Sequence, residues 1–109
     1  MYNRIAEQRY RFKYISKEHA FMKLYGAVII EQGVTFAILA VKRTVTQYTA
    51  RAMAFRQEVA SFFPNMPIIL MSKDASGKPH YYGRKDIVDF LNTVPFNRIP
   101  WKEYTISFY

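Results

Sequence analysis

The chain has 109 residues, half of them hydrophobic, and its 16 basic and 8 acidic residues give a formal net charge of +8. This length predicts a single domain over residues 1–109, and the apolar content excludes intrinsic disorder. The absence of cysteine excludes disulfides, thiolate metal sites and thiol catalysis. No apolar run approaches the roughly 18 residues of a membrane span, so we expect a cytoplasmic protein without membrane contact.

Basic and aromatic residues alternate in the first predicted strand, over about residues 9–15. A period of two places Arg9, Arg11 and Lys13 on one face and the aromatic rings on the other. A helix is the competing interpretation, because Arg9, Lys13 and Lys17 are also four residues apart. We favour the strand.

Two further strands are predicted at residues 24–31 and 34–45. Gln32-Gly33 lies between them, and glycine can take the positive φ of a tight hairpin turn. The middle of the second strand, residues 36–41, is apolar on both faces, which is typical of a central strand covered on two sides.

Apolar residues recur at helical spacing over about residues 47–63 and predict an amphipathic helix. They are Tyr48, Ala52, Phe55, Val59 and Phe62. A short buried strand at residues 67–71 follows. The order strand, helix, strand predicts a parallel crossover.

The remaining third of the chain predicts a second hairpin, a short helix and an edge strand. A polar turn at residues 73–78 leads into a returning strand at 80–82, and Asp86 opens a helix over about residues 84–94. Tyr104, Ile106 and Phe108 alternate with polar residues in the terminal strand. The predicted class is α/β or α+β, a mixed sheet with two hairpins and one β-α-β crossover.

Residues 9–72 resemble the core of the restriction-endonuclease-like nucleases. In that family the third strand carries an acidic residue, any residue and then lysine, and the two polar side chains hold a divalent metal at a phosphate. The matching triplet is Ala40-Val41-Lys42, in which the lysine is present and the acid is missing. Pairing through the tight turn places Glu31 about eight residues, or over about 20 Å, from Lys42. We therefore expect a degenerate site with no catalytic residue, no metal and no cofactor.

Residues 67–91 also resemble the second half of a thioredoxin-like domain, with a strand opened by proline, a hairpin and a closing helix. The redox cysteines of that family are absent, so its activity does not carry over.

Other catalytic interpretations are weaker. His19 and His80 are predicted to be surface residues. Asp86 and Asp89 are one helical turn apart, but acids in a first turn ordinarily complement the helix dipole.

Eight basic residues form the predicted nucleic-acid-binding surface: Arg4, Arg9, Arg11, Lys13, Lys17, Lys23, Lys42 and Arg43. The hairpin pairing sets Lys23 opposite Lys42 and Tyr25 opposite Ala40. Cations on strands can meet phosphates, and exposed tyrosines can stack on bases. We therefore predict a non-catalytic domain that binds DNA or RNA.

Three alternatives stay open. The aromatic residues of the first strand can be core, with its cations as a solvated outer face. The aromatic terminal strand can pair with a second subunit, which would make the protein a homodimeric interaction or scaffolding module. A metal-dependent nuclease would need carboxylates donated from elsewhere in the chain.

Overall fold

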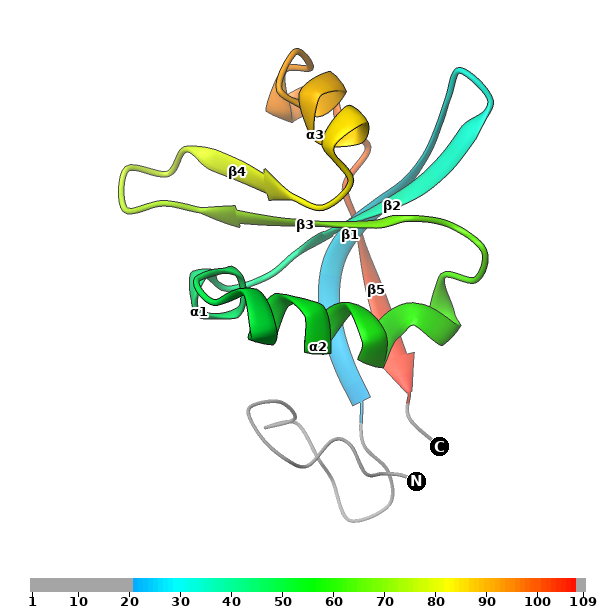
Figure 1. Cartoon of the computed structure of the whole chain (residues 1–109), viewed down its shortest axis with the longest axis vertical. Coiled ribbons are helices and arrows are strands. Elements are labelled where there is room, and N and C mark those ends of the chain that lie inside the picture. The colour runs from blue at the N-terminus through cyan, green and yellow to red at the C-terminus, as the bar shows by residue number, and fades with distance from the viewer. Residues whose placement is uncertain (1–20, 108–109) are drawn as a thin grey trace.

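A mixed five-stranded sheet is the framework of the fold in the computed structural model, which describes residues 21–107. Its strand order is β4-β3-β2-β1-β5. Only β2 and β3 run parallel to one another within this sheet. The strands are β1 (Phe21–Glu31), β2 (Val34–Ala40), β3 (Ile68–Lys73), β4 (Pro79–Tyr82) and β5 (Lys102–Ser107). The sheet twists strongly, so that β3 and β4 run across the view of Figure 1 while β1 and β5 run along it.

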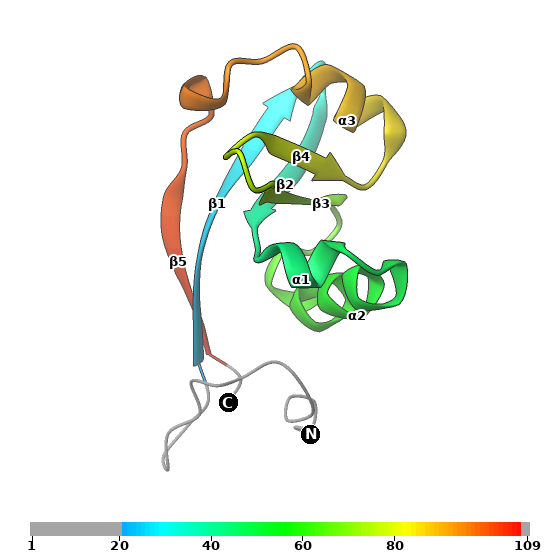
Figure 2. The ribbon, with the colours of Figure 1, turned by 90° about the vertical axis from the view of Figure 1, so that its left-hand side faces the viewer.

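Helices cover both faces of the sheet (Figures 1 and 2). The crossover between β2 and β3 contains α1 (Arg43–Thr46), α2 (Thr49–Val59) and the 3-10 helix η1 (Ala60–Phe62). On the opposite face lie α3 (Lys85–Leu91) and the 3-10 helix η2 (Phe96–Arg98). The predicted mixed sheet, both hairpins, the parallel crossover, the helix near 47–63 and the helix near 84–94 are confirmed. The fold is of the α+β type.

Two hydrophobic cores sit on the two faces of β2. Leu39 packs with α2 and Leu70 on one face, and Phe36 and Ile38 pack with α3 on the other. Because successive strand residues point to opposite faces, a strand buried on both sides must be apolar throughout. All four residues from Phe36 to Leu39 are buried, which confirms the prediction of a central strand.

The first hairpin follows its predicted register. Gln32 and Gly33 both have positive φ, at 52° and 79°, the backbone that a two-residue turn matching the strand twist requires. Ile29 pairs with Phe36, as the turn predicts. The pairing of β1 with β2 stops at Gly26, where an added Cβ would lie 2.7 Å from the carbonyl oxygen of Ile38. Glycine at this position permits that close approach.

The prediction that the strand beginning at residue 34 continues to about residue 45 is wrong. β2 ends at Ala40, and α1 begins at Arg43. The helical turn brings the Oγ1 of Thr46 to 2.7 Å from the Oγ of Ser72 on β3, with both residues buried. Val45 packs against the core on the α2 side. These tertiary contacts override the β propensity of the β-branched residues in this segment.

The predicted pairs Tyr25–Ala40 and Lys23–Lys42 are also wrong. Among the strands within residues 21–107, the part of β1 that precedes Gly26 pairs with β5, which sets Tyr25 opposite Glu103 and Lys23 opposite Thr105. Among the described strands, β5 lies at the edge of the sheet, as the terminal segment predicts. The predicted strand at residues 9–15 and the terminal Phe108 lie outside the described residues.

Thr46→Val should lower the free energy of unfolding by about 1–3 kcal/mol, because it leaves the buried Ser72 hydroxyl without its partner. The double variant with Ser72→Ala should lose less than the sum of the two single losses, since both ends of the bond are then gone. Urea denaturation of the four proteins measures the coupling. Strict additivity would contradict this role of the pair.

The Asp74 carboxylate organises the turn between β3 and β4. One of its oxygens accepts hydrogen bonds from the Ser76 hydroxyl at 2.7 Å, the Ser76 amide at 2.9 Å and the Lys78 amide at 3.0 Å. The other lies 2.8 Å from Nε2 of His80, whose side chain is 44% exposed. The hydroxyl of Ser76 and the ring of His80 are the main causes that hold the pKa of Asp74 well below its usual range.

Asp74→Asn should lower the melting temperature at pH 7, and its difference from wild type should narrow as the pH falls below about 4. A depressed native pKa stabilises the fold only above the pKa of the unfolded chain, and this stabilisation is lost as the pH drops toward the native value. Thermal melts followed by circular dichroism between pH 7 and pH 2 test this. A difference that is constant with pH would contradict it.

Candidate nucleic-acid interface

A cleft of about 430 Å³ opens at the carboxyl ends of β2 and β3. Because these strands are parallel, their ends meet at the same edge of the sheet, where open sheets commonly bind ligands. From residues 21–107, three cations and three aromatic rings line the cleft: Lys42, Arg43, Lys73, Tyr25, Phe96 and Trp101. We call this set of residues the cationic cleft.

Strand geometry explains how the lysines reach the cationic cleft. Ala40 is in register with Met71, so Lys42 and Lys73 each lie two residues beyond a matched pair. Lys73 is the last residue of β3, and Lys42 follows β2 with extended backbone. In extended backbone, side chains two residues apart share a face, and Ala40 and Met71 also line the cleft. Val41, between Ala40 and Lys42, packs against the core on the α2 side.

The aromatic wall is held by its own contacts. The indole N–H of Trp101 donates to the carbonyl oxygen of Phe96 at 3.3 Å, and the two ring centroids lie 5.2 Å apart with the planes tilted by 34°. The ammonium of Lys73 lies 4.6 Å from the centroid of the Phe96 ring, a cation–π contact. Tyr25 approaches from β1 and is 58% exposed.

The charge in the cationic cleft is uncompensated within residues 21–107. No carboxylate lines the cleft, and none of its three cations forms an ion pair with an acid of this range. Glu103, opposite Tyr25 in the β1–β5 pairing, is exposed and outside the lining. Unpaired cations around a concave surface attract anions.

The structure places the predicted site residues unevenly. Lys42 and Arg43 line the cationic cleft. Lys23 lies two residues from Tyr25 on β1 and shares its face, but it is not part of the lining. The other five predicted residues lie outside the described range: Arg4, Arg9, Arg11, Lys13 and Lys17.

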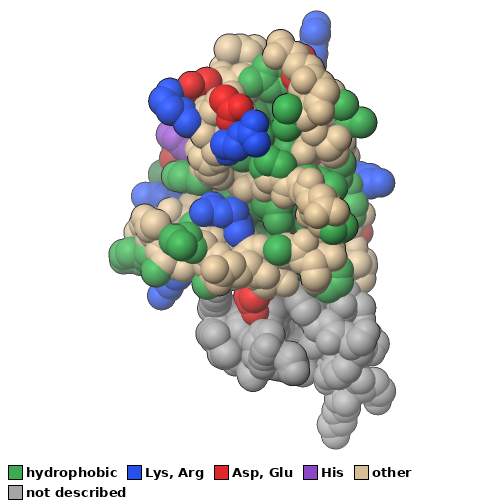
Figure 3. Space-filling view, turned by 45° about the vertical axis from the view of Figure 1, so that its right-hand side comes forward, with side chains coloured by type: hydrophobic (Ala, Val, Ile, Leu, Met, Phe, Trp, Pro, Cys, Tyr) green, Lys and Arg blue, Asp and Glu red, His purple; other side chains and the backbone are tan. Residues whose placement is uncertain are grey.

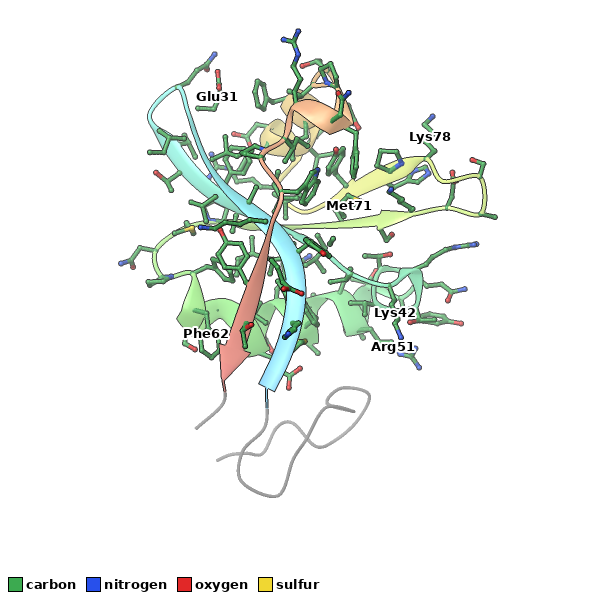
Figure 4. The ribbon with its side chains drawn as sticks, turned by 180° about the vertical axis from the view of Figure 1, so that it is seen from behind. Glu31, Lys42, Arg51, Phe62, Met71 and Lys78 are labelled. Atoms are coloured by element: carbon green, nitrogen blue, oxygen red, sulfur yellow. The ribbon has the colours of Figure 1, made fainter. Side chains whose placement is uncertain are left out.

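Two cations at this end of the molecule were missed by the sequence reasoning. The sequence pattern predicts a polar turn at Lys73, but the structure has Lys73 at the end of β3, in the position equivalent to that of Lys42 after β2. Arg51 lies near Lys42 (Figure 4) and donates a hydrogen bond to the carbonyl oxygen of Thr44 at 3.4 Å. In the sequence, Arg51 lies beside the apolar face of the predicted helix, and this position was the feature that could have identified it.

A second, larger hollow of about 730 Å³ lies between α2, β4 and α3. In Figure 3 hydrophobic side chains gather over the middle of the molecule, with Lys and Arg side chains beside them. Of the three cations from residues 21–107 that line this hollow, two are ion-paired: Arg84 with Asp86 at 2.8 Å and Lys85 with Asp89 at 2.7 Å. The same bond to Arg84 lowers the pKa of Asp86. The larger hollow is therefore the weaker attractor for phosphate.

Residues 21–107 contain no group of three or more His, Asp or Glu side chains placed to hold a metal ion. Glu31 pairs with Val34 and lies at the far end of the hairpin from Lys42 (Figure 4). Ala40 occupies the position at which the nuclease resemblance requires an acid.

Comparison with protein-family models, curated protein sequences and solved structures finds no significant match. None of the helices within residues 21–107 is long and apolar enough to cross a membrane.

Proposed function

We propose that this domain binds nucleic acid by contacting phosphates, and that it does so without catalysis. The observation that carries the proposal is the cationic cleft, in which Lys42, Arg43 and Lys73 surround a hollow that no carboxylate of residues 21–107 lines. Binding of a phosphate chain to such cations releases condensed counterions, which drives association. Clustered cations suit the binding of a polyanion, whereas a metal ion is held by negatively charged carboxylates.

Further cations can extend the contact beyond the cleft. Lys23 lies on the same sheet face as Tyr25, and Arg51 lies beside α1. The predicted strand at residues 9–15 adds Arg9, Arg11 and Lys13. A track of several phosphates is the ligand that this distribution favours, rather than one isolated anion.

Affinity for DNA or RNA should fall steeply with salt, with a log–log slope near −0.9 for each duplex phosphate contact. Fluorescence anisotropy of labelled duplex and single-stranded oligonucleotides between about 20 and 200 mM salt measures the slope. Absence of binding to any DNA or RNA at the lowest salt would overturn the proposal.

The amino-terminal cations provide a separate arm of this test. Charge reversal of Arg9, Arg11 and Lys13 to glutamate should abolish binding while the thermal melt stays unchanged. Intact binding by this variant would restrict the interface to the cationic cleft.

A metal-dependent nuclease is the second candidate. In the nuclease triplet the acid and the lysine face the same site, and here the two corresponding residues, Ala40 and Lys42, both line the cleft. It would need carboxylates from outside residues 21–107. Magnesium-dependent cleavage that is lost in Lys42→Ala would establish it in place of the binding function.

A dimeric interaction module is the third candidate, because β5 forms an edge of the described sheet. Unpaired edge groups can add a strand from a second copy. Sedimentation of a dimer that ignores nucleic acid would favour this candidate.

A further inference from the structure

We infer that the ligand of the cationic cleft is single-stranded nucleic acid, one base of which enters the cleft while the adjoining phosphates bind its cations. The inference rests on the proposed function and makes it specific. It follows from the aromatic rings, from the concave placement of the charges and from the size of the cleft.

The aromatic rings offer surfaces on which a base can stack. Tyr25 is 58% exposed, compared with 37% for Tyr82 on β4, and it forms one wall of the cleft. Trp101 is fixed by its bond to Phe96 and lines the same hollow. An exposed ring beside fixed aromatic groups and cations is the arrangement by which single-stranded nucleic acids are held, because every base has a π face.

A duplex cannot use these rings. Its base faces are covered by neighbouring pairs, and its grooves are entered by a protruding helix or ribbon. Here Lys42, Arg43 and Lys73 stand around a hollow rather than along a projecting element. The rings therefore favour an unstacked strand over a paired one.

The dimensions limit the cleft to about one nucleotide. Its volume of about 430 Å³ lies at the lower end of the range for small-molecule sites. The rest of the strand must cross the surrounding surface, to which Lys23 of β1 and Arg51 of α2 add positive charge.

Trp101 is the only tryptophan of the chain, so its fluorescence reports directly on the cleft. Oligothymidylate should quench this fluorescence at low salt and bind at least about 10-fold more tightly than a blunt duplex of equal length. Tyr25→Leu should weaken oligothymidylate binding about 5- to 100-fold, whereas Tyr25→Phe, which keeps the ring, should bind as wild type does. Tyr82→Leu is the matched control, because Tyr82 is an exposed tyrosine of the larger hollow.

The outcomes separate this inference from the proposed function. Equal or tighter binding of duplex, together with an unaffected Tyr25→Leu variant, would overturn the inference and leave the proposed function standing. Failure of every oligonucleotide to bind would overturn both. Quenching by thymidine monophosphate at the affinity of the oligomer would assign the cleft to a free nucleotide, and this too would overturn the inference.

Discussion

Joint replacement of Lys42, Arg43 and Lys73 by glutamate should reduce the affinity for nucleic acid about 100-fold or more at low salt. These three residues supply the charge of the cationic cleft, and no described acid compensates them. Reversal removes their phosphate contacts and adds repulsion. Anisotropy titrations against oligothymidylate give the loss. The corresponding alanine variant should flatten the salt dependence by roughly one contact for each residue that binds a phosphate.

A matched control separates the cleft from the overall charge. Reversal of Arg56, Lys85 and Lys102 changes the net charge by the same amount. Arg56 and Lys85 line the larger hollow, and Lys102 contacts Tyr104 on the face of the sheet that α2 covers. We expect this variant to retain most of the affinity. An equal loss in both variants would show that the charge acts diffusely and that the cleft is not the interface.

Phe36→Ala should lower the free energy of unfolding by about 3–5 kcal/mol, the largest effect we expect from one substitution. Phe36 is 1% exposed on the central strand and packs in the core beneath α3. Its truncation removes the transfer free energy of the ring and leaves a cavity that β-sheet neighbours cannot fill. Because small domains have only about 5–15 kcal/mol of stability, part of the population should be unfolded at moderate temperature. Urea denaturation measures the change.

Ile30→Ala is the control for this prediction. Ile30 lies on β1, close to the strand residue that pairs with Phe36, yet it is 71% exposed. The substitution should change the free energy of unfolding by no more than about 0.5 kcal/mol. Similar losses in the two variants would contradict the assignment of the core to the two faces of β2.

Local patterns predicted most of the elements. Helical spacing identified α2. Two residues of the predicted apolar face are exposed, Tyr48 before the helix and Phe62 after it, and the neighbouring Phe63 is the buried ring at the second of these ends. The run of residues that is apolar on both strand faces identified β2, and the Gln32-Gly33 turn predicted the register of the first hairpin. Each of these signals acts between residues that are near in sequence, which is why pattern alone could find them.

The candidate site was predicted only in part, for a physical reason. Lys42 and Arg43 could be named from the sequence because they follow a recognisable buried strand. Lys73 joins them because β3 pairs with β2 across the crossover, and Trp101 joins them through the segment that follows α3. Both are contacts between residues far apart in sequence. No periodicity encodes which distant strand ends meet.

The amino-acid sequence by itself determined the excess of positive charge, the absence of cysteine chemistry, the missing acid before Lys42 and the order of the five described strands with α2 and α3. These properties follow from composition and from local residue spacing. Tertiary structure alone decided where β2 ends, because a buried bond between Thr46 and Ser72 turns the chain into α1. Tertiary structure also brings Lys73 and Lys42 together, because β2 and β3 pair in parallel. Cations that are far apart in sequence therefore line one cleft.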